Sequence, residues 1–496
     1  MLFLAAALVG RADELFDLAA IRDPSTLETR VVLDWTVSPK HPDIRQKLIE
    51  ITVCEWWAGQ KVRLPVTLCA PATGGPCTNL IVTNMAPILK PALPIGAVLR
   101  LLKEHQVGVV LVGMSTIDAM PPKGQLHLGM KTNLLRTKDP RFTPAWIWGM
   151  SDMRALTAAC AEQDVFRPNR IIVTGASKRG VAAAISGIHD DRFTGMFPVV
   201  TPIQKNPQGA YVQGSALAEE MAENATFIAQ LAPGPNPLGL PETTRTGLEA
   251  REQRRRDQSI SREEAETAGW SREDMLVMND RAWEPFRITR HLDEIRRRGL
   301  DFFYQVGSND NVSPGLLELG RAHPDFPIYI APGGQHGGPP GIGYSRETPN
   351  QPECEENLLA FALHHFTGAR SLPGPPRLTA AWDEGKHELT VTAAFPAGVE
   401  PAVNRLSWSI DRHRPYTYAA EYDRWESKDM SRDHGNTFRV VVTLPAFAIR
   451  VDFISTHRDV ENGLPFTISS PYQGIRLEKA VTNTEENAVH ANAAEN

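Results

Sequence analysis

The feature that most constrains the fold is a repeated alternation of short apolar runs with stretches of helical spacing. Residues 79–83, 107–113 and 170–174 are rich in Val, Ile and Leu and are almost free of charge. Strands that are buried on both faces have this composition, and they occur in parallel sheets covered by helices. Stretches of helical spacing follow these runs, as at 95–105 and 180–188. The chain therefore predicts an α/β fold, with a mostly parallel sheet and helices on both faces.

Segments at the start and in the middle of the chain depart from this alternation. Residues 48–54 and 62–69 read as strands joined by a short turn, which predicts an antiparallel opening to the sheet. After a strand at 193–200, residues 204–285 carry charged helical stretches and no strand-like run. We interpret this segment as a helical cap insertion beside the sheet. The alternation then resumes with predicted elements at 288–298 (helix), 302–306 and 327–330 (strands) and 356–366 (helix).

A change of pattern after the Pro-Gly-Pro-Pro run at 373–376 indicates a second domain. Short segments with alternating apolar residues follow, for example 388–392 and 437–442, and turn residues separate them. Such spacing is typical of an antiparallel β-sandwich. We therefore expect an α/β domain over 13–372, a C-terminal antiparallel β-sandwich domain over 373–478 and a disordered tail over 479–496.

The first residues of the chain form the only segment that suggests targeting. Residues 1–12 are almost entirely apolar, long enough for the core of a signal peptide and too short to span a bilayer. We read them as a signal peptide without the usual basic start, which predicts a periplasmic or secreted protein; without export the protein would be cytoplasmic. The net charge of −6 gives no reason to expect nucleic acid or an anionic membrane as a partner.

Cysteine and histidine patterns bear on metals and disulfides. The five cysteines are widely spaced and form no C-x-x-C pair, so they match neither a zinc site nor a disulfide framework. The spacing is compatible with one bridge, between Cys69 and Cys77, and we expect most cysteines to be buried thiols. His364 and His365 are adjacent on a predicted helix and so point to different faces. The sequence thus predicts no metal and no cofactor.

The most informative short motif is Gly175-Ala176-Ser177-Lys178-Arg179-Gly180, which stands between a predicted buried strand and a helix of small residues. A serine on a sharp strand-to-helix turn forms a nucleophile elbow, and small residues are needed around so tight a turn. Gly175 and Gly180 meet that need, whereas Arg179 replaces the second glycine of the usual G-x-S-x-G pattern. Taken alone, the motif is equally compatible with an ordinary glycine-rich turn.

Two residues further along the chain complete a set with Ser177. Hydrolases with a nucleophile elbow supply their partners in the order serine, acid, histidine. Asp310 follows the predicted strand 302–306, and His336 follows the strand 327–330, so both stand at strand ends. Each has another explanation in isolation: Asp310 would cap the next helix, and His336 would be a surface loop histidine. Their order and their places after successive strands favour a Ser177–His336–Asp310 triad.

The same interpretation predicts where a developing oxyanion would bind. One donor should be the backbone N–H of Lys178, which directly follows the nucleophile. The second should come from the loop after the strand 79–83, which reads Asn84-Met85-Ala86-Pro87. Because proline has no N–H, the candidates in that loop are Met85 and Ala86.

The segment 172–180, with its core Val173-Thr174-Gly175-Ala176-Ser177-Lys178-Arg179-Gly180, resembles the PhoPQ-activated pathogenicity-related protein family, which belongs to the α/β-hydrolases. Asp191-Arg192-Phe193, the acid and histidine segments and the C-terminal domain fit the resemblance, which covers most of the chain. Val181 stands where that family usually has Trp. The resemblance implies an α/β-hydrolase fold for the domain over 13–372, with Arg179 as part of a variant elbow.

A second resemblance is to glucuronoyl esterases, which have a G-C-S-R-x-G elbow and an upstream A-W-A-W-G segment. Ala145-Trp146-Ile147-Trp148-Gly149 is similar to the latter. This resemblance makes Trp146 and Trp148 candidates for substrate contact, and Arg179 is a third candidate. The two tryptophans are equally compatible with a place in the core. In those enzymes an arginine after the serine assists the oxyanion, and Lys178 occupies that position here without arginine's planar fork.

Together these features predict a serine hydrolase that cleaves a carboxylic ester, with a sugar-linked ester suggested by the second resemblance. The substrate is then a small-molecule or carbohydrate-linked ester. Two alternatives stay open: a peptidase or amidase that uses the same triad, and a catalytically silent binding protein with a hydrolase fold. The sequence does not fix the oligomeric state.

Overall fold

The computed structural model places most of the chain, and all structural statements below refer to that part. The predicted signal peptide, the predicted tail and parts of the predicted cap lie outside the described residues. The described residues are 15–114, 125–203, 215–231, 242–312, 315–336, 352–396, 398–415 and 417–477.

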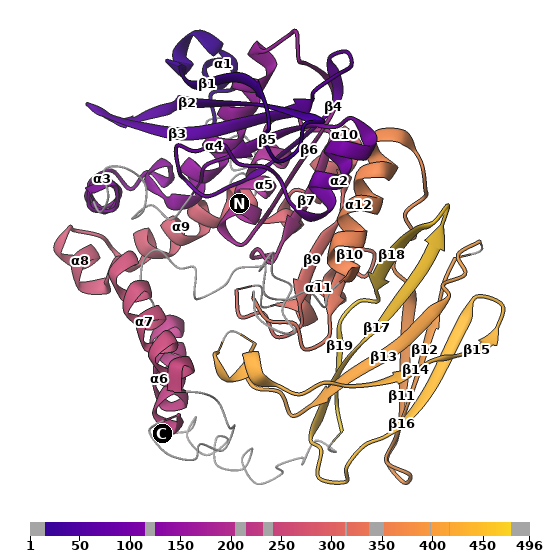
Figure 1. The fold of residues 1–496 in the computed structure, drawn as a ribbon. Helices are drawn as coiled ribbons and strands as arrows, with labels where there is room; N and C mark the ends of the chain where they lie inside the picture. Colours follow the sequence, from indigo (N-terminus) through magenta and orange to yellow (C-terminus); the bar gives the residue numbers. More distant parts are fainter. Residues whose placement is uncertain are drawn as a thin grey trace, which may run out of the picture.

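A ten-stranded sheet forms the centre of the molecule (Figure 1), with the strand order β1-β2-β3-β5-β4-β6-β7-β9-β10 and with β8 paired to β7. The first pairings, from β1 to β2, β3 and β5, are antiparallel, and every later pairing is parallel. This is the order of an α/β-hydrolase sheet, extended by one antiparallel edge strand. Its members are β1 (Arg30–Val37), β2 (Ile44–Trp57), β3 (Gln60–Pro71), β4 (Cys77–Asn84), β5 (Gly108–Val112), β6 (Phe166–Ala176), β7 (Gly195–Val199), β8 (Asp301–Phe302), β9 (Tyr304–Gly307) and β10 (Ile328–Ala331).

Helices cover both faces of the sheet, as its apolar strands require. In β5, Val110 and Val112 belong to one buried cluster, and Val109 and Leu111 belong to another. Successive side chains of a strand point to opposite faces, so each cluster marks one covered face. The first cluster includes α4 (Pro144–Ala161) and α5 (Lys178–His189), and the second includes α2 (Gly96–His105) and α12 (Pro352–Thr367). The remaining α-helices of this part are α1 (Leu18–Arg22), α3 (Gln125–Thr137), α10 (Leu292–Arg298) and α11 (Leu316–Ala322).

The predicted cap is helical in the part that the structure describes. It leaves the sheet after β7 and returns at β8, and its helices are α6 (Ser215–Gln230), α7 (Glu242–Gln258), α8 (Arg262–Thr267) and α9 (Arg272–Trp283). Capping boxes fix the starts of α8 and α9, where Ser261 and Ser271 bond the third residue of each helix. In Figure 1 the pair α6–α7 extends from the α/β part on the same side as the C-terminal strands.

The residues 377–477, called the C-terminal unit below, form two antiparallel sheets. Their strand orders are β11-β12-β16-β15 and β14-β13-β17-β18, with β19 on β17. The bounds are β11 (Arg377–Asp383), β12 (Glu388–Ala394), β13 (Val403–Ile410), β14 (Glu426–Asp429), β15 (Ser431–His434), β16 (Thr437–Thr443), β17 (Arg450–Glu461), β18 (Leu464–Ser469) and β19 (Gln473–Arg476).

The C-terminal unit shares its core with the α/β part. Apolar side chains from both of its sheets lie in the same buried cluster as α2 and α12. The rings of Phe303 and Phe466 lie 4.7 Å apart across the boundary. Asn357 of α12 also bonds the backbone of Thr467 in β18 as a second strand would: its Nδ2 donates to the carbonyl at 2.9 Å, and its Oδ1 accepts from the N–H at 2.7 Å.

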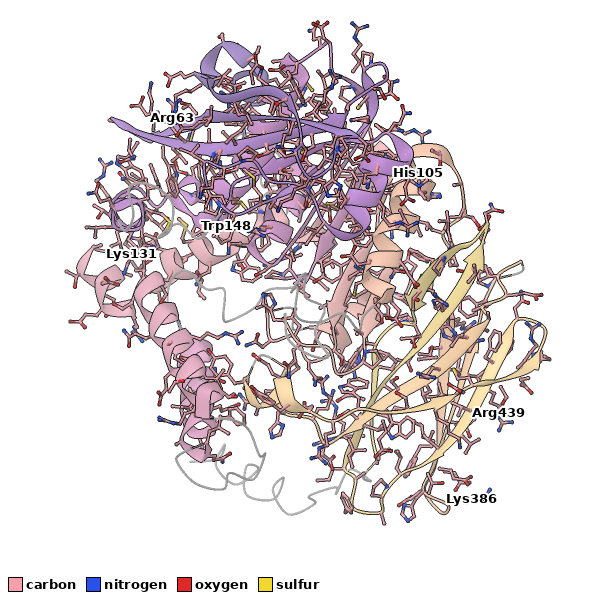
Figure 2. The ribbon with its side chains drawn as sticks, in the orientation of Figure 1. Arg63, His105, Lys131, Trp148, Lys386 and Arg439 are labelled. Carbon is pink, nitrogen blue, oxygen red and sulfur yellow. The ribbon has the colours of Figure 1, made fainter. Side chains whose placement is uncertain are left out.

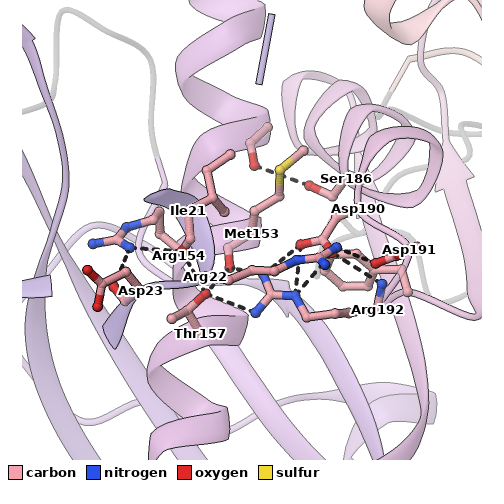
Figure 3. Close-up of polar contacts among 12 residues, drawn as sticks. Ile21, Arg22, Asp23, Met153, Arg154, Thr157, Ser186, Asp190, Asp191 and Arg192 are labelled. Atoms are coloured by element: carbon pink, nitrogen blue, oxygen red, sulfur yellow. Dashed lines mark hydrogen bonds and ion pairs between the residues drawn. The ribbon is translucent and has the colours of Figure 1, made fainter. Parts of the chain in front are cut away.

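A polar network holds the N-terminal segment, the second half of α4 and the end of α5 together (Figure 3). Arg154 of α4 is 2% exposed and donates to the carbonyls of Ala20 and Ile21 at 3.1 and 2.8 Å. Asp190, at the end of α5, pairs with Arg192 at 2.6 Å and with Arg22 at 2.8 Å. Because α5 begins directly after Ser177, this network fixes the helix that carries the elbow.

The structure corrects some details of the sequence predictions. All five cysteines are free, so the bridge that the spacing allows between Cys69 and Cys77 is not formed. The sequence predicts a helix from about Gly149 to Glu162, but α4 begins earlier, at Pro144. Proline is compatible with the first helical position because no N–H partner is needed there. The sequence does not predict strand β1, because six of its eight residues are exposed and none is buried, so it has no buried alternation. Among the described helices, none has the length and hydropathy needed to cross a membrane.

Candidate active site

Ser177 lies on the turn between β6 and α5 with a strained backbone. Its φ of 59° and ψ of −127° form a conformation that L-residues rarely adopt, as expected at a nucleophile elbow. The Ser177 N–H donates to the carbonyl of Val199 at 3.0 Å, which ties the turn to β7. A Cβ at Gly180 would lie 2.7 Å from that same carbonyl oxygen, and one at Gly175 would lie 2.6 Å from the Arg179 oxygen. The close approaches therefore fall on Gly175 and Gly180, which explains why Arg179 is compatible with the turn.

Ser177, His336 and Asp310 form one line of hydrogen bonds. Ser177 Oγ lies 2.8 Å from His336 Nε2, and His336 Nδ1 lies 3.0 Å from Asp310 Oδ1. The Asp310 side chain is 0% exposed and that of His336 is 25% exposed, so the outer end of the line is open to a substrate. Asp310 Oδ1 also accepts the N–H of Val312 at 2.8 Å. The structure thus brings together the three residues that the sequence selected.

The loops that carry the acid and the histidine are bonded to each other. Beyond β9 and β10, the N–H of Ser308 donates to the carbonyl of Ala331, and the N–H of Asn309 donates to that of Gly334, both at 2.9 Å. The N–H of Gly333 donates to Ser308 Oγ at 2.7 Å. The pairing of the two parallel strands therefore continues beyond β9 and β10, toward Asp310 and His336.

The structure distinguishes between Met85 and Ala86, the two candidates for the second oxyanion donor. The N–H of Met85 donates to the carbonyl of Val112 at 2.9 Å, so it is already used in the sheet. The N–H of Ala86 has no acceptor among the described residues. Lys178 is the first residue of α5, a position whose N–H has no acceptor within its own helix. The amides of Lys178 and Ala86 are the pair that the geometry leaves for an oxyanion.

A buried polar group lies behind the elbow. Asp152 of α4 is 0% exposed, and its Oδ1 accepts from Asn84 Nδ2 at 3.2 Å. Burial raises the pKa of Asp152 to about 8, against the opposing effects of the Asn84 bond and the Arg179 charge. Arg179 Nη2 donates to the carbonyl of Met85 at 3.2 Å, so this side chain braces the loop that holds Ala86. The sequence did not mark Asp152 as a neighbour of the site, because nothing local signals the burial of a helical carboxyl.

The two tryptophans predicted as substrate contacts pack against the core of the α/β part. Trp146 donates from Nε1 to the carbonyl of Leu15 at 2.9 Å and stacks on Phe16 with a centroid distance of 6.2 Å. Trp148 is half-buried against the core, and its Nε1 has no partner among the described residues. In Figure 2 it lies among the helices of the α/β part, away from Lys386, in the turn between β11 and β12, and from Arg439 of β16. Arg179, the third candidate, bonds the loop that holds Ala86.

Residues of the C-terminal unit lie beside the acid and the histidine, and no local sequence pattern predicts this. Glu421 is 8% exposed, and its Oε1 pairs at 2.9 Å with Arg251 of α7. Burial raises the pKa of Glu421; the Arg251 charge opposes that shift, and the nearby charge of Asp310 adds to it. The described residues contain no group of three His, Cys, Asp or Glu side chains arranged for a metal ion.

Comparisons with known proteins agree with the resemblance found in the sequence. The family model of the PhoPQ-activated pathogenicity-related protein matches residues 143–210, which span α4, the elbow and β7. No curated protein sequence matches the chain.

Three similar solved structures share low identity with the chain. An acetyl xylan esterase from a Paenibacillus species is 13% identical with a TM-score of 0.39, over 66% of this chain and 89% of that one. A puromycin-hydrolysing peptidase of Mycobacterium tuberculosis is 14% identical with a TM-score of 0.36, over 65% of this chain and 40% of that one. A glucuronoyl esterase from Teredinibacter turnerae is 17% identical with a TM-score of 0.28, over 36% of this chain and 46% of that one. The chain therefore spans under half the length of the last two.

Proposed function

We propose that the protein is a serine hydrolase that cleaves a carboxylic ester, with Ser177 as nucleophile, His336 as general base and Asp310 as its orienting acid. The observation that carries the proposal is the unbroken line from Ser177 Oγ through the His336 ring to Asp310. The strained elbow under Ser177 supports it, since such strain persists where a function requires it.

The contacts assign a role to each ring nitrogen of His336. An ionised carboxylate only accepts hydrogen bonds, so the proton of the neutral ring lies on Nδ1, facing Asp310. Nε2 is then the acceptor for the Ser177 proton as Oγ attacks the ester carbonyl. His336 returns that proton to the leaving alcohol, and the resulting acyl-Ser177 ester is hydrolysed by water activated in the same way.

The negative charge that develops on the carbonyl oxygen would lie between the N–H groups of Lys178 and Ala86. One such donor typically contributes about 3 kcal/mol to transition-state stabilisation. The Lys178 side chain adds a positive charge at the same turn; burial and the neighbouring Arg179 charge lower its pKa. The ester preference follows the sequence resemblance, which also suggests a sugar-linked substrate.

Labelling with a fluorophosphonate probe tests the proposal. The wild type should be labelled at Ser177, and the variants Ser177→Ala and His336→Ala should not be. The variant Asp310→Asn should fold normally and lose about 10⁴-fold in kcat, because the ring then takes the wrong tautomer. A folded wild type that resists the probe and all substrates would refute the proposal in favour of a silent binding protein. Aryl esters, methyl glucuronate esters and peptide anilides, assayed together, separate an esterase from a peptidase.

A further inference from the structure

The side chain of Asn309, the neighbour of Asp310 in the chain, is bonded mainly by the C-terminal unit. Its other partner is Ser308, whose Oγ donates to Asn309 Oδ1 at 3.3 Å. Asn309 is 2% exposed. Its Nδ2 donates to the carbonyls of Asp423 and Glu421 at 2.7 and 3.4 Å. Its Oδ1 accepts from Trp425 Nε1 at 2.8 Å and from Arg412 Nη2 at 3.1 Å. Both donors and both acceptor sites of the amide are therefore used, and the orientation is fixed because Trp and Arg only donate.

The same part of the C-terminal unit also holds the residue next to His336. Gln335 Nε2 donates to the carbonyl of Glu421 at 2.7 Å. That carbonyl is the one that accepts from Asn309. A single backbone oxygen, in the connection between β13 and β14, thus receives a bond from the residue before the acid and from the residue before the base.

Arg412 joins these contacts into a rigid group. Its side chain is 5% exposed, and its Nε pairs at 3.0 Å with Asp423, whose side chain is 6% exposed. Its Nη2 reaches the carbonyl of Ser308 at 3.0 Å as well as Asn309, and its guanidinium lies 5.3 Å from the centre of the Trp425 ring. A planar fork that serves several acceptors at once cannot be replaced by the single ammonium of lysine.

We propose that Arg412, Glu421, Asp423 and Trp425, called the clamp below, form a positioning element of the active site that sets the distance between Asp310 and His336. This inference rests on the proposed function of that triad. Loops at the ends of strands need such support, since a misplacement of about 1 Å costs about 100-fold in rate. The C-terminal unit would therefore be part of the catalytic machinery rather than an appended domain.

The variants Arg412→Met and Arg370→Met, made in the full chain, separate positioning from general stability. Arg370 is a matched control: its side chain is 0% exposed, it pairs with Asp459 at 2.9 Å, and it lies over the Phe466 ring at 5.1 Å. Its bonds go to Ser371, Leu464 and Asp459 and to no residue of the two catalytic loops. Both variants should lower the melting temperature.

The measured quantity is kcat per active site. The concentration of active sites is determined by titration with a fluorophosphonate to completion, so that unfolded protein is not counted. Arg412→Met should lower this kcat by about 100-fold with KM changed by less than about threefold, and Arg412→Lys should not restore it. Arg370→Met should keep kcat within about threefold of the wild type, because its partners lie outside the site.

Two milder variants decide the question if Arg412→Met does not fold. Gln335→Met removes only the bond from the histidine loop to the Glu421 carbonyl. Asn309→Asp keeps the shape of the side chain but loses its two N–H donors. Each variant should lower kcat by about tenfold or more. If all these variants keep the kcat of the wild type while Ser177→Ala is inactive, the clamp proposal is overturned and the proposed function stands. If the wild type itself neither reacts with the probe nor cleaves an ester, both proposals fall.

Discussion

Replacing Gly307 with alanine would test how closely the acid loop and the histidine loop must approach each other. Gly307 ends β9, three residues before Asp310. A Cβ built there would lie 2.1 Å from the carbonyl oxygen of Gly334 and 2.4 Å from its carbonyl carbon. Both atoms belong to the backbone two residues before His336, so no side-chain rotation can relieve the contact.

The size of the forced movement follows from these distances. Since Cβ atoms essentially never lie under 3.0 Å from such a neighbour, the gap between Gly307 and Gly334 must open by about 0.9 Å. The Asn309 N–H bonds that same carbonyl at 2.9 Å, so the link between the two loops would be stretched or lost. Overpacking of this kind typically costs about 1–3 kcal/mol in stability. A shift of that size between base and acid should lower kcat by about 100-fold.

The assay is steady-state hydrolysis of the ester that the wild type cleaves fastest, together with urea unfolding of each variant. Gly374→Ala is the control, because a Cβ at Gly374 meets nothing within 4 Å. This control should keep both the activity and the stability of the wild type. A Gly307→Ala enzyme with kcat within threefold of the wild type would show that the loops tolerate the displacement, and the reasoning would be refuted.

Three further predictions concern stability and reactivity. With the pKa of Asp152 at about 8, the folded state keeps a proton that the unfolded state releases near pH 4. Because of this group, the free energy of unfolding should fall as pH rises between those two values, by up to about 1.4 kcal/mol per pH unit. Asp152→Asn should flatten that slope in urea titrations at pH 5, 7 and 8.5; an unchanged slope would contradict the assignment. Arg154→Met should lower the free energy of unfolding by about 2–4 kcal/mol, because buried carbonyls lose their donors, and a loss under about 0.5 kcal/mol would contradict this. Burial raises the pKa of Cys54 and Cys69 to about 12, so these thiols should react with Ellman's reagent at pH 8 only after unfolding in guanidinium; fast reaction of the native chain would oppose it.

The parts of the fold that the sequence predicted are those with a local pattern. Strand β5 is apolar at every position because both of its faces are covered, and that pattern is visible in the residues themselves. Ser177, Asp310 and His336 were found because each follows a buried strand, and the order of the strands along the chain places those ends together.

The parts that were missed depend on partners far away in the chain. Asn309 is bonded by residues 103 to 116 positions downstream, and a lone asparagine after a strand carries no sign of that. The sequence also predicts the Met85 N–H as an oxyanion donor, because its bond to Val112 depends on the pairing of β4 with β5, which no local pattern shows. Free Cys69 shows the same limit, since spacing alone does not give the distance between two side chains.

The core that the C-terminal unit shares with α12 also governs how the molecule loses its structure. A domain with its own core unfolds on its own and gives a separate heat-absorption peak. Here, release of β18 would uncover Phe303 and break the two bonds between Asn357 and Thr467, so the α/β part would lose core and hydrogen bonds at the same moment. The two parts should therefore melt as one cooperative unit, and a compound bound at Ser177 should stabilise strands more than two hundred residues away in the chain.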